Sequence, residues 1–327
     1  MDRKYFFLAV AVAAAIGLVL RNEYLLHVLI LTFIWCTVVA AWDLVMGYAG
    51  ILNFAQLVFF AIGGYAAGMI SIQFGITPAL AIPLAALLVA LLGVAIGAPC
   101  LRLRGEYVVL FTFAVHLATP TLLEQGRAIG TGGSGGLMGM PAFNIFGHIL
   151  RSRDKVDWYF VTLCLATLSC YFIYYVVLKR KSGRAFIALR DAETSAKALG
   201  VNEYGFKLLV FAISAAITAL AGAFYTFYVG LITPSVLGNE FFLIVMAMIS
   251  IGGLGRFPGV LVGAVIVTLG NEALRTFGEY RLLIVGFVLV LTILYMPDGL
   301  VAGIRRAWHR LRKPKLQLIP PVGVAHH

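Results

Sequence analysis

The 327 residues include 25 lysines and arginines and 14 aspartates and glutamates, a formal net charge of +11. Charged residues make up 12% of the chain, about half the ~25% of an ordinary soluble domain. With 61% apolar residues and a mean hydropathy of +0.97, most of the chain cannot face water. A span needs roughly 20 mostly apolar residues, so ten spans would use about 200. This composition excludes a soluble core, a large extramembrane domain and a single-span anchor.

Ten apolar segments follow one another along the chain, and they are apolar on every face. They cover residues 5–20, 25–46, 50–73, 78–98, 106–123, 157–178, 206–229, 240–252, 257–274 and 281–297. The strands of a membrane barrel would instead alternate apolar and polar residues over about 10 positions. We therefore expect an all-α polytopic membrane protein with about ten transmembrane helices, in which 1–327 forms a single transmembrane domain.

Two of these segments have an alternative interpretation. Segment 240–252 is short for a span and ends in GGLGRFPG, which favours a broken or re-entrant segment covered by protein. Segment 5–20 follows charged residues and contains AAA at 13–15, so a cleaved signal peptide is the alternative to a first span.

The basic residues orient the stack, because short cytoplasmic loops are enriched in lysine and arginine. With the amino terminus inside, 18 of the 25 lie on the inner side. We therefore expect both termini in the cytoplasm, a cytoplasmic loop at 179–207 and an outer loop at 124–156. The basic tail at 303–327 is expected to face anionic lipid headgroups rather than nucleic acid.

No catalytic or metal-binding motif is present. The four cysteines and six histidines show no metal-ligand spacing, and the sequence contains neither H-E-x-x-H nor G-x-S-x-G. It also lacks G-x-x-x-x-G-K-[ST], so the chain cannot itself cradle ATP phosphates. We expect no enzyme activity, no metal and no cofactor bound by this chain. If ATP drives it, the energy enters through a partner.

Glycines recur at small-xxx-small spacing, as at 64 and 68, 93 and 97, and 255, 259 and 263. This spacing favours close helix packing over a direct substrate role. Two interrupted segments, GYAGILNFAQ and ISIGGLGRFPG, lie in opposite halves of the chain and point to a transport path between halves of inverted topology. The candidate path residues are Asn53, Gln56, Gly63, Gly64, Gly252 and Gly253.

Acidic residues deep in the spans are few, which argues against an ion-coupled carrier. Asp43 lies in the second span, and Glu272 lies near the end of the ninth. For Asp43, hydrogen bonding to a neighbouring helix and a functional role remain open alternatives.

The loop at 179–207 predicts a short helix of about eight residues, on the order of 12 Å long. Asp191 is the expected N-cap, Glu193 lies in the first turn, Lys197 follows at i+4, and Gly200 ends the helix. A helix this short is marginal in water, so it should dock either on this chain's own spans or on a soluble motor. The face expected to dock comprises Ala192, Ala196 and Leu199.

The outer loop has six glycines among residues 130–139. A flexible linker and a surface that docks a partner or gates the path are equally compatible with this composition.

Six blocks in order resemble the M-type permease of branched-chain amino acid ABC importers. They read GYAGILNFAQLVFFAIGGYAAG, LRLRGEYVVLFTFA, TGGSGGLMGMP, GRAFIALRDAETSAKALGVN, ISIGGLGRFPGVLVGA and NEALRTFGEYRLLIVG. The resemblance covers roughly residues 40–300 and implies a ten-helix importer permease in the bacterial inner membrane. It also implies four kinds of partner: a homologous H-type permease, two cytoplasmic ATPases that bind ATP-Mg, a periplasmic binding protein and an amino acid substrate.

By the same resemblance, the stretch from Asp191 to Gly200 is similar to the loop that couples such a permease to its ATPase. The importer signature reads E-A-A with a glycine three residues later, and only Ala196 and Gly200 match it. Many members have Gly-His where this chain has Ala55 and Gln56. Two alternatives to an amino acid importer remain: a urea or short-amide ABC importer permease, and an ion-coupled secondary carrier or channel.

Overall fold

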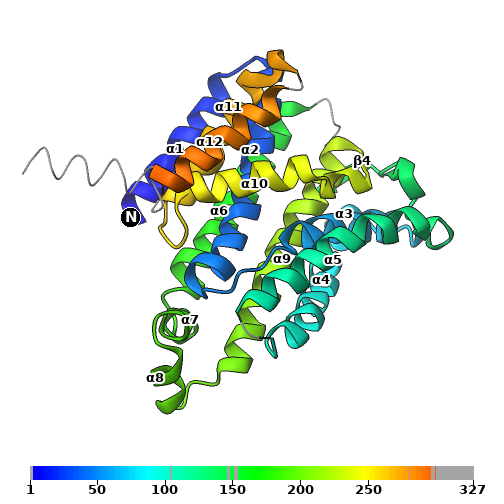
Figure 1. Cartoon of the computed structure of the whole chain (residues 1–327). Coiled ribbons are helices and arrows are strands. Elements are labelled where there is room, and N and C mark those ends of the chain that lie inside the picture. The colour runs from blue at the N-terminus through cyan, green and yellow to red at the C-terminus, as the bar shows by residue number, and fades with distance from the viewer. Residues whose placement is uncertain are drawn as a thin grey trace, which may run out of the picture.

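The computed structural model describes residues 3–103, 105–145, 148–150, 154–278, 280–295 and 299, and the basic tail predicted at 303–327 lies outside them. Within these ranges, each apolar segment predicted from the sequence forms a helix (Figure 1). These helices are α1 (Arg3–Val19), α2 (Glu23–Asp43), α3 (Gln56–Gln73), α4 (Pro78–Cys100), α5 (Glu106–Gln125), α6 (Lys155–Tyr171), α9 (Glu203–Val229), α10 (Asn239–Gly252), α11 (Gly259–Ala273) and α12 (Tyr280–Tyr295). The all-α polytopic fold is thereby confirmed.

Two of the spans continue as π-helical turns, η1 (Leu44–Tyr48) after α2 and η4 (Phe172–Val177) after α6. With these and other short extensions included, seven helices in the described ranges are long and apolar enough to cross a membrane. The two short helices α7 (Lys181–Asp191) and α8 (Glu193–Ala198) lie between α6 and α9, beyond the end of the bundle (Figure 1).

Helices α2 and α9 begin in the same way, with Asn-Glu-Tyr. The side-chain oxygen of Asn22 accepts a hydrogen bond from the Tyr24 amide at 3.0 Å, and that of Asn202 accepts one from the Gly205 amide at 3.0 Å. Each asparagine is therefore an N-cap, and the glutamate that follows it lies where the helix dipole favours an anion.

The two helices run antiparallel beside one another. His27 near the start of α2 contacts the hydroxyl of Tyr228 near the end of α9 at 2.6 Å, whereas Ser214 in the first half of α9 donates to the carbonyl of Ala41 late in α2 at 2.7 Å. Helix α9 packs on α3 and α4, as α2 packs on α10 and α11. This arrangement agrees with the predicted inverted topology of the two halves.

Glycines bring the backbones of these helices into contact. A Cβ on Gly222 of α9 would overlap the carbonyl oxygen of Phe60 in α3, and one on Gly93 of α4 would lie 2.6 Å from the Cβ of Ala215. The close packing predicted from the glycine spacing is therefore present in the α3–α9 and α4–α9 contacts.

Helix α10 lies across α2 rather than beside it (Figure 1). At its start, the ring of Phe242 lies 6.2 Å from that of Trp42, and in the turn that follows it the Gly255 amide donates to Asp43 at 2.6 Å. Both ends of α10 thus meet the same half of α2. Its 14 residues measure about 21 Å, short of the roughly 30 Å hydrocarbon layer. The short length of α10 agrees with the broken or re-entrant segment predicted at 240–252.

The described part of the loop at 124–156, which is predicted to lie outside, is folded onto the bundle. Strand β1 (Leu137–Met138) pairs antiparallel with β4 (Leu231–Ile232), which follows α9, and β2 (Phe143–Ile145) pairs with β3 (His148–Leu150). The short turns around them are η2 (Gly126–Ile129), η3 (Gly133–Gly135), η5 (Pro234–Leu237) and η6 (Leu274–Phe277). The paired strands do not have the form of a free linker; docking of a partner here stays a prediction.

We predict that Gly222→Val destabilises the protein by about 1–3 kcal/mol or more, because the added side chain overlaps α3. Gly270→Val in α11 is the matched control, since nothing lies within 4 Å of the Cβ that would be added there. Thermal unfolding of the purified protein in detergent measures both variants. Equal midpoints for the two would contradict the backbone contact.

Candidate functional site

Helix α7 is amphipathic and lies against the bundle. It buries Ala185, Phe186 and Leu189, and the ring of Phe186 meets that of Phe206 at the start of α9 edge to face, with centroids 6.2 Å apart. Gly183 is required in this helix because a Cβ there would overlap the backbone of Leu178. The loop at 179–207 is therefore docked on this chain's own spans through α7.

The predicted capping of the next helix is wrong. Asp191 is the last residue of α7 rather than an N-cap, and the residue before α8 is Ala192, which has no capping side chain. The physical reason is that the break between the two helices falls at Ala192, whose φ of −152 and ψ of 68 are not helical, so Asp191 stands one residue too early to cap α8. Its carboxylate pairs instead with the Nε of Arg190 at 2.8 Å. Helix α8 accordingly has six residues rather than about eight.

The predicted apolar face of α8 is also wrong in part. Ala196 is buried, whereas Ala192 is exposed and Leu199 is 86% exposed. The predicted stop is confirmed: Gly200 has φ +83, a left-handed conformation that favours glycine after a helix.

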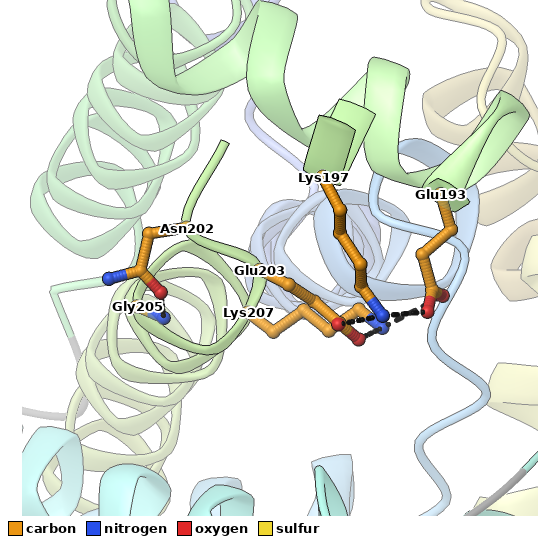
Figure 2. Close-up of polar contacts among 6 residues, drawn as sticks. All are labelled: Glu193, Lys197, Asn202, Glu203, Gly205 and Lys207. Carbon is orange, nitrogen blue, oxygen red and sulfur yellow. Dashed lines mark hydrogen bonds and ion pairs between the residues drawn. The ribbon is translucent and has the colours of Figure 1, made fainter. Parts of the chain in front are cut away.

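Charged side chains tie α8 to the start of α9. Figure 2 shows Glu193, Lys197, Glu203 and Lys207 pointing toward one another. Lys197 Nζ lies 2.7 Å from a Glu193 oxygen, which confirms the predicted i+4 pair, and also contacts Glu203. Lys207 Nζ lies 3.2 Å from Glu193 and pairs with Glu203 at i+4. Such pairs are individually weak near water, but here four charges form one network.

The hydrogen bond from Lys197 holds the pKa of Glu193 below its ordinary value. The stabilisation of the fold by the ionised Glu193 carboxylate is therefore complete at pH values above the ordinary pKa of a glutamate. It is lost only as the pH falls through the lowered pKa of the folded protein. At neutral pH Glu193 is therefore ionised and can pair with Lys197.

A cavity of about 610 Å³ lies beside this network. Its other wall is formed by the turn between α4 and α5 and by the residues just before α3; the lining includes Gly50, Leu52, Arg102, Glu106 and the four charged residues of the network. The cavity is thus lined by charges of both signs.

A second polar cluster lies inside the bundle, where α2, α3 and α9 meet. Gln56 Nε2 donates to the Ser214 hydroxyl at 2.8 Å and also to Thr218, and the Asn53 amide donates to Gln56 Oε1 at 3.2 Å. The indole of Trp42 donates to the Asn53 carbonyl at 2.6 Å. Asn53 and Gln56 are both fully buried. The Gln56 side chain thus joins α3 to α9, and the Asn53 side chain is held by Gln56.

The glycines predicted for the path fall into two groups that pack against different helices. A Cβ on Gly63 would overlap Ala219 of α9, and one on Gly64 would overlap Thr226 of the same helix. Gly252, at the end of α10, lies against Val260 of α11, and Gly253 follows it in the turn between these helices. A role of these residues along a substrate path stays a prediction.

The acidic residues singled out from the sequence have clear partners. Asp43 is buried and accepts hydrogen bonds from the Gly255 amide and from the Tyr174 hydroxyl, the latter at 3.1 Å. Glu272 accepts from Tyr24 and pairs with Arg275 at 3.2 Å at the opposite end of the bundle. The hydrogen-bonding alternative for Asp43 is therefore present in the structure.

Sequence comparison assigns the chain to a family. Residues 24–293 match the family described as the permease component of branched-chain amino acid transport systems. The chain belongs to this family. The expected resemblance is confirmed, and the permease is a multi-pass membrane protein.

Three relatives show the range of similar permeases. The permease is 29% identical over 322 residues to the high-affinity branched-chain amino acid transport system permease protein LivM of Salmonella typhimurium, an alignment that covers 92% of this chain and 75% of that protein. It is 28% identical over 160 residues to LivH of the same organism, an alignment that covers 48% of this chain and 49% of that protein. It is 26% identical over 259 residues to the ribose import permease protein RbsC of Haemophilus influenzae, an alignment that covers 71% of this chain and 72% of that protein. No solved structure matches the chain.

We predict that Gln56→Leu lowers the free energy of unfolding by about 1–3 kcal/mol, because the buried Asn53 amide loses its acceptor. Thermal unfolding in detergent measures the loss. Gln73→Leu, near the surface at the end of α3, is the control, because Gln73 donates one exposed hydrogen bond to Ile129. An unchanged stability of Gln56→Leu would contradict the structural role of this cluster.

Proposed function

We propose that this chain is the transmembrane permease subunit of an ATP-driven, binding-protein-dependent importer of branched-chain or other small amino acids. It pairs with a homologous H-type permease, and two cytoplasmic ATPases supply the energy. A periplasmic binding protein delivers the substrate. Family membership and the LivM and LivH relatives support this proposal.

The observation that carries the proposal is the attachment of α8 to the bundle. The 27 residues of α9 measure about 40 Å, longer than the roughly 30 Å hydrocarbon layer, so the helix can cross the layer with its charged first turns outside it. Glu203 and Lys207 in these turns hold Glu193 and Lys197 of α8. A push on α8 is therefore transmitted directly to a helix that packs at the centre of the bundle.

The proposed mechanism is alternating access. ATP binding closes the ATPase dimer in the cytoplasm, the stretch from Asp191 to Gly200 moves with it, and the helices tilt to open the path to the other side. The binding protein selects the substrate, so the permease needs little affinity of its own. The buried Asn53 and Gln56 and the glycines of α3 and of the α10–α11 turn are the candidate polar surface of the path.

The importer is tested in proteoliposomes that contain this permease with its partner subunits and binding protein. We expect ATP-dependent uptake of radiolabelled leucine, isoleucine or valine, with urea, acetamide and ribose as competing substrates. Uptake of urea or acetamide in place of the amino acids would favour the short-amide importer. Uptake that persists without the ATPases and follows an ion gradient would instead establish a secondary carrier.

We predict that Asp191→Arg and Gly200→Val uncouple ATP hydrolysis from uptake while the protein remains inserted. The first change breaks the pair with Arg190, and the second forces a β-branched residue into a left-handed conformation at a cost of roughly 1–2 kcal/mol. ATPase activity and uptake are measured in the same vesicles.

Gly75→Val is the matched control for Gly200→Val. Gly75 has φ +64 and, like Gly200, has nothing within 4 Å of an added Cβ, but it follows α3 at the other end of the bundle. The control should retain uptake. Equal loss of uptake in both variants would show that backbone strain alone accounts for the effect.

A further inference from the structure

Three segments distant in the sequence converge where α7 meets the bundle. The residues that meet there are Asp43, Gly47, Gly50, Arg190 and Gly255. Asp43 and Gly47 belong to the end of α2 and its π-helical turn, Gly50 to the linker before α3, Arg190 to α7, and Gly255 to the turn between α10 and α11.

Arg190 bridges α7 and the end of α2. Its Nη1 donates to the carbonyl oxygen of Gly47 at 2.5 Å, and its Nε pairs with Asp191 at 2.8 Å. Carbonyls in the last turn of a helix lack an intrahelical donor, and the helix dipole makes that end attractive to a cation. The planar guanidinium presents donors in a fixed fork, so Asp191 sets the orientation in which Arg190 reaches Gly47.

The same arginine touches the linker and the turn. A Cβ on Gly50 would lie 2.6 Å from Cγ of Arg190, so the aliphatic stem rests on this glycine. A Cβ on Gly255 would lie 3.1 Å from Arg190 Nη1 and 2.9 Å from the Gly47 carbonyl oxygen. Both positions leave room for the arginine only because they lack side chains.

Asp43 fastens the turn from inside the bundle. Its buried carboxylate accepts from the Gly255 amide at 2.6 Å and from the hydroxyl of Tyr174, in the π-helical turn after α6. The Tyr174 ring stacks on that of Phe257, which belongs to the α10–α11 turn, with centroids 4.0 Å apart. The turn between α10 and α11 is thus held to α2 and α6, and any shift of the end of α2 is transmitted to it.

We propose that Arg190 is the positioning residue through which displacement of α7 and α8 reaches α2 and the α10–α11 turn, with Asp43 holding that turn to α2. The inference rests on the proposed function. It assigns Asp191 the task of orienting Arg190, and it adds to the α8–α9 network a second connection, which acts on α2 and on the α10–α11 turn.

The first test compares Arg190→Ala and Arg190→Lys with Arg184→Gln in the assembled importer. Arg184 is an exposed arginine of the same helix, so its replacement removes the same charge without the Gly47 contact. We expect Arg190→Ala to lower the amount of substrate imported per ATP hydrolysed about tenfold, in line with loss of a hydrogen bond to a charged group. Arg190→Lys should import more substrate per ATP than Arg190→Ala, and Arg184→Gln should match the wild-type ratio.

The second test separates transmission from folding. Single spin labels are placed at Leu199, which is 86% exposed after α8, and at Leu254, which is 40% exposed in the α10–α11 turn. In the otherwise wild-type importer we expect ATP with vanadate to change the electron paramagnetic resonance spectrum at both sites. In Arg190→Ala the change at Leu199 should persist and the change at Leu254 should be lost.

An unchanged import-to-hydrolysis ratio in Arg190→Ala, or a spectral change at Leu254 that survives it, would overturn the inference while leaving the importer intact. Parallel loss of thermal stability, hydrolysis and import, with Lys giving no rescue, would also overturn it, because Arg190 would then be structural only. Import by the wild-type permease without ATPases would instead remove the proposed function itself.

Discussion

Close contact between helix backbones is the constraint on which the rest of the structure depends. Lipid tails are as apolar as the side chains they touch, so burial supplies little force between helices, and packing must come from close approach. Gly222 lies against the Phe60 carbonyl, and Gly263 lies against Met248 and Gly252. These contacts place α9 against α3, which joins the two halves of the permease, and α10 against α11 within the second half.

Polar groups follow the same constraint, because an unpaired polar atom in an apolar interior is costly. The side chains of Gln56 and Ser214 and the carbonyl of Ala41 form a connected series across α3, α9 and α2. Asp43 plays the corresponding part for the α10–α11 turn through the Gly255 amide. Gln56 at the start of α3 and Asp43 at the end of α2 thus each join their helix to another part of the bundle.

The sequence predicted the helices and their packing well, because long apolar runs and glycine spacing report directly on burial in a membrane. It could not predict partners that are far apart in the chain, such as Gln56 and Ser214, which are separated by 158 positions. The local rule for an N-cap failed at Asp191, since α7 continues through this residue and the break before α8 falls at Ala192. Arg190 itself carried no sequence signal for its contact with Gly47, because one more arginine in a basic loop is unremarkable.

The brevity of α8 has a consequence for how a partner can recognise it. Six residues are too few to stay helical in water without outside support, and here that support comes from charges on α9 and from the packing of Ala196. The shape that this segment presents is therefore a property of the folded bundle and not of the segment. A free peptide with the same residues would lack that shape, so a partner that recognises the helical form of α8 would bind it only while α8 is attached to α9.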